Sequence, residues 1–93
     1  MTSAATVIEE TAKHFMVPRE VWCGSNSHAK SNVIICAVAC AAAERLSVNR
    51  AEFAAAIQLS EDTVADVGRK AAFKHSMHVA DVLTRVHKLE PTP

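Results

Sequence analysis

The sequence predicts an all-α fold, a compact bundle of five to six helices that contains a helix-turn-helix. The strong hydrophobic periodicities lie near 3.6 residues rather than two. Hydrophobic residues make up 49% of the chain and aromatic residues only 4%, so the core is expected to consist of Ala, Val, Ile and Leu. The length of 93 residues suits one modest core. We therefore assign residues 1–89 to a single helical domain and residues 90–93 to a tail.

Two helices are expected near the N-terminus of the chain. The first runs from Ser3 to Phe15, because hydrophobic residues recur there on one helical face. Its inward positions are Val7, Ile8, Thr11, Ala12 and Phe15. Pro18 suits the first turn of a short second helix that ends at Trp22, since proline has no N–H group to leave unpaired there.

The third helix follows a polar loop, residues 25–30, and is expected to extend from an N-cap at Ser31 to Leu46. Its uncharged run, residues 31–43, would be only about 20 Å long, against roughly 30 Å for a bilayer core. We therefore expect a buried helix and no membrane span. Cys36 and Cys40 lie one turn apart in it and are expected to be small buried hydrophobes. Free thiols suit a reducing cytoplasm, and the chain starts without the pattern of a signal peptide.

The segment from Asn49 to Arg69 carries the pattern of a helix-turn-helix. Asn49 can cap one helix, residues 58–60 break it, and Ser60 can cap a second helix that ends near Phe73 or Lys74. The positions expected to be buried are Phe53, Ala56 and Ile57 on the first helix and Val64, Val67 and Ala71 on the second. In DNA-binding proteins with this layout, the second helix enters the major groove.

A last helix is expected from Met77 to Leu89, with Ser76 as its cap, and the prolines at 91 and 93 prevent its continuation. The side chains predicted to form the core are Phe15, Trp22, Val33, Cys36, Leu46, Phe53, Ile57, Val64, Val67 and Leu83.

The net charge bears directly on nucleic-acid binding. Lys and Arg balance Asp and Glu, so the formal net charge is zero and the pI is near 7. A neutral domain has no general attraction to phosphate. DNA binding would then require positive charges gathered on one face, or a dimer.

Several segments of the chain stand in the order of a known DNA-binding domain. They are HFMVPREVW, AAAERL, RAEFAAAI and the Arg69–Lys70 pair. Over about Val7 to Leu89, this order resembles the C-terminal DNA-binding domain of the bacterial replication initiator DnaA, a helical fold related to the Trp repressor. The motif that this family writes as Arg-Asp-His-Thr-Thr-Val aligns with residues 59–64, and the family's trailing Arg-Lys pair aligns with Arg69 and Lys70.

The resemblance implies DNA binding but not the initiator's origin specificity. Thr63 and Val64 match the end of the family motif, whereas residues 59–62 differ from it. The loop before the third helix keeps His28 and Lys30 but lacks the family's run of arginines. A small relative without an ATPase domain or a Walker-type phosphate loop suits a bacterial or phage-derived transcription regulator.

These arguments give a set of candidate DNA-binding residues. Expected base contacts come from Asn26, Ser60, Glu61 and Thr63, and expected backbone contacts from Lys30, Arg50, Arg69 and Lys70, with His28 beside them in the loop. The expected partners are double-stranded DNA, possible second copies in a homodimer, and RNA polymerase or an architectural DNA-bending protein. The expected location is the cytoplasm, in association with the nucleoid.

Other readings of the same residues are open. The basic residues could form a solvated face paired with Glu44, Glu52 and Asp66. A protein-interaction adaptor could keep the DnaA-like fold without DNA binding, and an exposed apolar patch on the last helix around Met77, Val79 and Leu83 would favour it. His75 and His78 have a spacing usable by a metal, but without a matching carboxylate or thiolate we expect no metal site and no cofactor. No nucleophile has a convincing base nearby in sequence, so we expect no enzyme activity.

Overall fold

The computed structural model describes residues 2–23 and 30–89, and for residues 30 and 31 it describes the backbone alone. Over these ranges the chain forms six helices and no strand, which confirms the all-α prediction. The helices are α1 (Ala4–Phe15), α2 (Arg19–Trp22), α3 (Lys30–Arg45), α4 (Arg50–Ile57), α5 (Glu61–Lys74) and α6 (Ser76–Leu89). The predicted tail lies outside the described residues. In the part that is described, no helix is long and apolar enough to cross a membrane.

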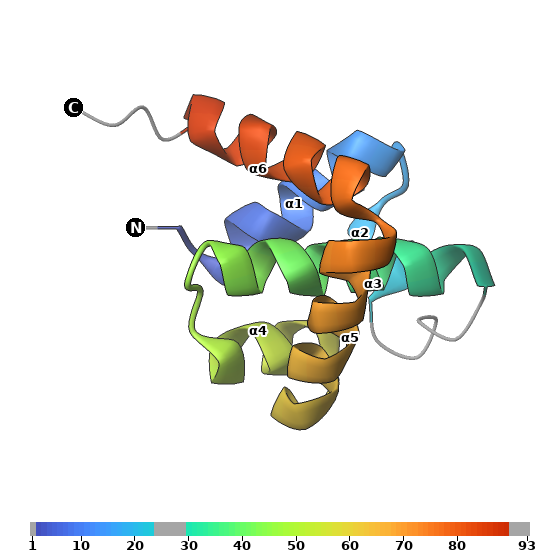
Figure 1. Ribbon diagram of the computed structural model, residues 1–93, viewed down its shortest axis with the longest axis vertical. Coiled ribbons are helices and arrows are strands. Elements are labelled where there is room, and N and C mark those ends of the chain that lie inside the picture. Colours follow the sequence, from blue (N-terminus) through green and yellow to red (C-terminus); the bar gives the residue numbers. More distant parts are fainter. Residues whose placement is uncertain (1, 24–29, 90–93) are drawn as a thin grey trace.

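The helix α3 runs through the middle of the bundle, and the other helices pack around it (Figure 1). Every residue from Ile35 to Ala43 is buried. A helix that is surrounded by others must carry small side chains where its neighbours come close, and five alanines in this stretch meet that need. Cys36 and Cys40 are buried and free, as predicted. They contribute to the core as small apolar side chains.

Most of the predicted core is confirmed, with one clear error. Trp22, Phe53, Ile57, Val64 and Cys36 are buried, and Phe15, Leu46, Val67 and Leu83 are partly buried against the same core. Val33 was predicted to be buried but is 49% exposed. The inward face of the first turns of α3 passes through Asn32, Ile35 and Cys36, so that Val33 falls about 100° away from it.

The helix caps follow the sequence closely. Asn49 caps α4 and Ser60 caps α5, each through a side-chain oxygen that accepts a backbone N–H three residues on. The predicted caps Ser31 and Ser76 are wrong, because both residues lie inside their helices: α3 begins at Lys30 and α6 begins at Ser76 itself. Only His75 separates α5 from α6, which leaves no room for a separate capping residue.

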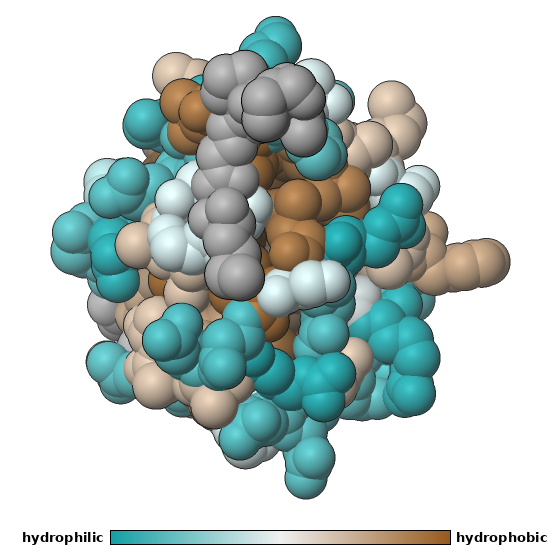
Figure 2. Space-filling model, turned by 90° about the vertical axis from the view of Figure 1, so that its left-hand side faces the viewer, coloured by the Kyte–Doolittle hydropathy of each residue, from teal (hydrophilic) through white to brown (hydrophobic). Residues whose placement is uncertain are grey.

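Hydrophobic and hydrophilic residues are unevenly distributed over the surface. On the face shown in Figure 2, hydrophobic surface lies in the middle and hydrophilic side chains lie below it and on both sides. Two large apolar side chains near the junction of α5 and α6 are highly exposed, Phe73 at 90% and Met77 at 82%. The alternative of an interaction module predicts an exposed apolar patch around Met77, Val79 and Leu83. Met77 is exposed, but Val79 is buried and Leu83 is partly buried, so the patch as predicted is wrong.

Charged groups join α1 to α6. The Glu10 side chain is only 6% exposed, and its Oε2 lies 3.3 Å from Lys13 Nζ while its Oε1 lies 3.3 Å from Arg85 Nε. A buried carboxylate is tolerated only where positive groups compensate for the loss of water. Arg85 therefore links α6 to α1 through a buried carboxylate that it shares with Lys13.

A histidine pair lies beside this ion-pair cluster. His14 Nε2 of α1 and His78 Nδ1 of α6 are 3.0 Å apart, and Phe15 packs against both rings. His14 is therefore half-buried, although a surface position is the simplest expectation for a histidine next to a lysine. The hydrogen bond needs one unprotonated nitrogen as acceptor, so it is lost when both rings are protonated.

The stability of the domain is expected to fall as the pH is lowered below about 6.5, the usual pKa of histidine. Burial lowers the pKa of His14, and the charges of His78 and Arg85 lower it further, while Asp81 acts in the opposite direction. A histidine whose pKa is lower in the folded than in the unfolded state contributes its full stabilisation above the unfolded pKa. As the pH falls, this contribution is lost, because the unfolded chain takes up the proton first. Urea unfolding between pH 7.5 and 5.5 tests this dependence.

The matched variants are His14→Asn and His87→Asn, the latter at an exposed position near the end of α6. The first should flatten the pH dependence, and the second should leave it as in the parent. An equal pH dependence in the parent and in His14→Asn would contradict the assignment to His14.

Candidate nucleic-acid interface

The helices α4 and α5 are joined by three residues, Gln58 to Ser60, as the sequence predicts. Gln58 ends α4 in a left-handed conformation, with φ 59° and ψ 44°, which turns the chain sharply. Phe53 and Ile57 of α4 and Val64 of α5 are buried. Leu59, which lies in the turn between the two helices, is partly buried against the same core. The first turn of α5 lies at the end of the molecule far from α6 (Figure 1).

This first turn carries three of the candidate base-contacting residues. Ser60, Glu61 and Thr63 are all exposed. The Thr63 backbone N–H donates to Ser60 Oγ at 3.2 Å, and the two hydroxyl groups are hydrogen-bonded at 2.7 Å. The cap thus fixes the positions of both hydroxyl groups on the surface. Asp62 is also exposed there, so the turn is acidic.

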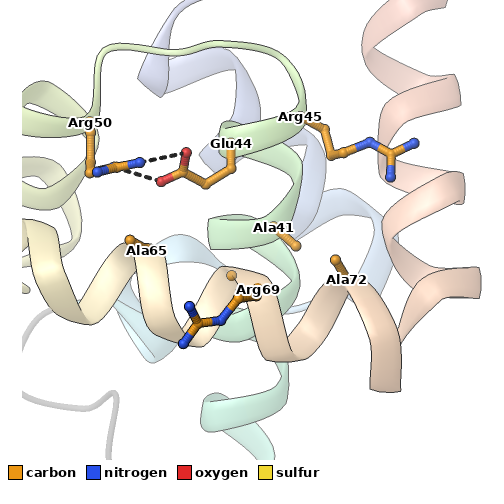
Figure 3. Close-up of a pocket in the computed structure, with 8 residues that line it drawn as sticks. Ala41, Glu44, Arg45, Arg50, Ala65, Arg69 and Ala72 are labelled. Carbon is orange, nitrogen blue, oxygen red and sulfur yellow. Dashed lines mark hydrogen bonds and ion pairs between the residues drawn. The ribbon is translucent and has the colours of Figure 1, made fainter.

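Arg50 lies at the start of α4 and is paired with Glu44, the next-to-last residue of α3. Arg50 Nε donates to Glu44 Oε1 at 2.7 Å, and Arg50 Nη2 donates to Glu44 Oε2 at 3.2 Å (Figure 3). This hydrogen bonding and the negative charge of Glu44 raise the pKa of Arg50, and the charges of Glu61 and Asp62 act in the same direction.

Arg69 and Lys70 lie further along α5 and share one carboxylate. Arg69 Nη2 donates to Asp66 Oδ1 at 2.7 Å, and Lys70 Nζ lies 3.2 Å from Asp66 Oδ2. Lys70, followed by Arg69, lowers the pKa of Asp66. The two basic side chains are 78% and 67% exposed. Ion pairs this exposed contribute little to stability, so either side chain can leave Asp66 at small cost.

The remaining candidates are placed only in part. Asn26 and His28 lie outside the described residues, and Lys30 begins α3 with a side chain that is not described. The structure thus pairs Arg50 with Glu44 at the start of α4, and it places Arg69 and Lys70 about two turns along α5 from Ser60 and Thr63. The sequence-based alternative of paired basic residues is confirmed for Glu44 and Asp66.

One residue of this region was missing from the candidate set. Arg45, the last residue of α3, lines a shallow pocket of about 240 Å³ between α3, α4 and α5. The other residues of the pocket are Ala41, Glu44, Arg50, Ala65, Gly68, Arg69 and Ala72. Figure 3 shows the Arg45 side chain extending toward α6, away from the Glu44–Arg50 pair. Its position could not be read from the sequence, because the pocket is formed by residues of three helices.

Possible metal ligands do not gather in the described part of the chain. Over residues 2–23 and 30–89, no group of three or more His, Cys, Asp or Glu side chains is placed to hold a metal ion. His78 is bonded to His14, and His75 ends α5.

Comparison of the chain with protein-family models, curated proteins and solved structures gives no match. The assignment of a function therefore depends on the geometry of α4 and α5 and on the resemblance noted from the sequence.

Proposed function

We propose that the domain binds double-stranded DNA with α5 in the major groove, and that it serves a bacterial or phage-derived transcription regulator in the nucleoid. The observation that carries this proposal is the exposed, capped first turn of α5 at one end of the molecule. The N-terminal residues of a recognition helix are those that reach base edges. Exposed basic side chains further along the same helix are suited to phosphate contacts.

The candidate residues whose side chains the structure describes have distinct roles in this proposal. Ser60 and Thr63 offer hydroxyl groups that can pair with several base edges, and Glu61 offers a carboxylate that can accept from the amino group of cytosine. Arg69 and Lys70 can leave Asp66 and pair with phosphate oxygens, and Arg50 can leave Glu44 in the same way. Because these cations are already paired within a neutral chain, a single domain should bind weakly.

Tight binding would then depend on more than one contact surface. A homodimer, repeated DNA sites or a partner such as RNA polymerase or an architectural DNA-bending protein would raise the effective concentration at the site. The affinity and its salt dependence are therefore better tests than the occurrence of binding alone.

Lys70→Ala is expected to weaken binding to all duplex sequences alike and to flatten its salt dependence. Each phosphate contact contributes a slope of about −0.9 to the plot of log K against log salt, so the magnitude of the slope should fall by about 0.9. Fluorescence anisotropy with a mixed-sequence duplex between 25 and 200 mM salt, about the range over which such contacts are screened, measures the slope. The control is Lys88→Ala, which removes one exposed lysine from α6 and should leave the slope unchanged.

Thr63→Ala tests sequence recognition separately. It should change which duplexes are selected from a random library, because the first turn of α5 faces the bases in this proposal. If the folded domain, tested at low salt and also as a linked dimer, selects no sequence, the DNA proposal fails. The adaptor alternative would then be preferred, and the exposed Phe73 and Met77 are the observation in its favour.

A further inference from the structure

A second pocket continues from the one between α3, α4 and α5. It encloses about 250 Å³ between the end of α3, α5 and α6, and it shares Arg45 and Ala72 with the first pocket. The side chains of Val79 and Leu83 line its α6 side. The two pockets adjoin at these shared residues, and we call the surface that they make together the Arg45 groove. It runs from Arg50 at the start of α4 to Leu83 in α6.

The floor of the Arg45 groove consists of small residues. Ala41, Ala65, Gly68 and Ala72 line the first pocket, and Ala80 of α6 lines the second. Ala41 and Gly68 are buried where α3 and α5 cross, so a partner would contact Ala65, Ala72 and Ala80. The short side chains of these three residues allow another helix to approach closely. Leu83 supplies a larger apolar contact at one end. The groove therefore suits the apolar face of a helix.

The charged residues of the Arg45 groove are three arginines and one glutamate: Arg45, Arg50, Arg69 and Glu44. The carboxylate of Glu44 has both oxygens bonded to Arg50, so neither is free for a partner. Arg45 is exposed and, among the residues that the structure describes, forms no ion pair. Arg69 shares Asp66 with Lys70. The groove thus has an excess of positive charge, and an acidic partner matches it.

We propose that the Arg45 groove binds an acidic amphipathic helix of a partner protein. The apolar face of that helix packs on the alanines and Leu83, and its carboxylates pair with Arg45 and Arg69. Such helices commonly dock in shallow apolar grooves through residues spaced three and four apart. This surface lies beside the first turn of α5 rather than on it, so the proposal does not depend on DNA binding.

Phe73 and Met77 are two further apolar side chains at the junction of α5 and α6. They adjoin the lining residues Ala72 and Ser76 in sequence and are almost fully exposed. Exposed side chains of this size commonly mark interaction sites.

The test uses two synthetic helical peptides with the same leucine stripe, one with glutamate and the other with lysine at the flanking positions. Titration of the full chain, followed by backbone amide NMR, should show binding of the glutamate peptide. The amide shifts should be concentrated at Ala72, Ala80 and Leu83. The lysine peptide should bind at least about tenfold more weakly, since like charges would then face one another.

Two variants test the assigned residues. Arg45→Glu should remove the preference for the glutamate peptide, whereas Lys88→Glu, an equal change of charge at an exposed position elsewhere, should retain it. Ala80→Gln adds bulk to the floor at an exposed position and should weaken both peptides. Thermal melting of each variant checks that it is folded.

Equal binding of the two peptides, shifts outside the Arg45 groove, or unchanged binding to folded Arg45→Glu would overturn the proposal. Lys70→Ala separates it from the DNA proposal, because that variant should weaken DNA binding while Arg45 and the groove floor remain intact. Binding of the glutamate peptide without any binding of DNA would support the groove proposal and contradict the DNA proposal.

Discussion

Replacing Trp22 by Ala is expected to lower the free energy of unfolding by about 3–5 kcal/mol, as for other large buried aromatic side chains. Trp22 is fully buried although it belongs to a helix of only four residues. A helix this short cannot be stable by itself, so its position depends on tertiary contacts. Trp22 supplies the largest of them, and the Asn32 side chain adds a hydrogen bond of 2.8 Å to the Val21 carbonyl.

Two variants separate the size of the side chain from its polar group. Among the residues that the structure describes, the buried Trp22 Nε1 has no hydrogen-bond partner, and an unpaired buried N–H costs stability. Trp22→Phe removes that group while keeping an aromatic ring, so it should cost much less than Trp22→Ala. Val21→Ala, at a 42% exposed position of the same helix, should change stability by no more than about 0.5 kcal/mol. Urea unfolding followed by circular dichroism measures all three, and a loss below about 1 kcal/mol for Trp22→Ala would mean that α2 is peripheral.

The features that the sequence predicted well are those that neighbouring residues determine. Asn49 and Ser60 cap their helices because each needs only an N–H group three residues away. The periodicity of α5 likewise placed Val64 in the core and Arg69 outside. Val33 was misplaced because the sequence shows that a helix is apolar but not which of its sides the other helices cover. At that end of α3, the covered side passes through Asn32 and Cys36.

Contacts between distant residues explain what the sequence could not give. The buried Glu10 carboxylate is paired with Arg85 on the last helix as well as with Lys13. Nothing around Glu10 in the sequence indicates the distant partner Arg85. The candidate DNA-binding residues of α5 were found from local capping and periodicity. The Arg45 groove was not found, since its lining residues come from four helices and are unremarkable in each of them.

Replacing Gly68 by Val is expected to lower the free energy of unfolding by about 3 kcal/mol, at the upper end of the usual cost of overpacking. Gly68 lies where α5 crosses α3. An added Cβ would lie 3.2 Å from the carbonyl carbon and oxygen of Cys40 and 3.3 Å from the backbone N of Ala41. These atoms belong to the backbone of the most enclosed helix of the bundle, which cannot move without disturbing the rest.

Helix propensity acts in the opposite direction and is too small to compensate. Valine is more favourable than glycine inside a helix by only a few tenths of a kcal/mol. The control is Ala65→Val, three residues earlier on α5, where the added methyl groups would enter the open pocket between α3, α4 and α5 (Figure 3). That variant should cost only about 0.6 kcal/mol, the difference in propensity between alanine and valine.

The same comparison tests whether the α3–α5 crossing positions the candidate DNA-binding helix. If Gly68→Val remains folded, α5 must move away from α3, and with it the first turn that carries Ser60 and Thr63. Binding to DNA should then weaken in Gly68→Val at temperatures where it is still folded, and Ala65→Val should retain it. Equal stabilities of the two variants in urea unfolding would contradict this prediction. They would show that the α3 backbone moves at Cys40 to admit a side chain at position 68, and that glycine is not needed there to set the distance between α3 and α5.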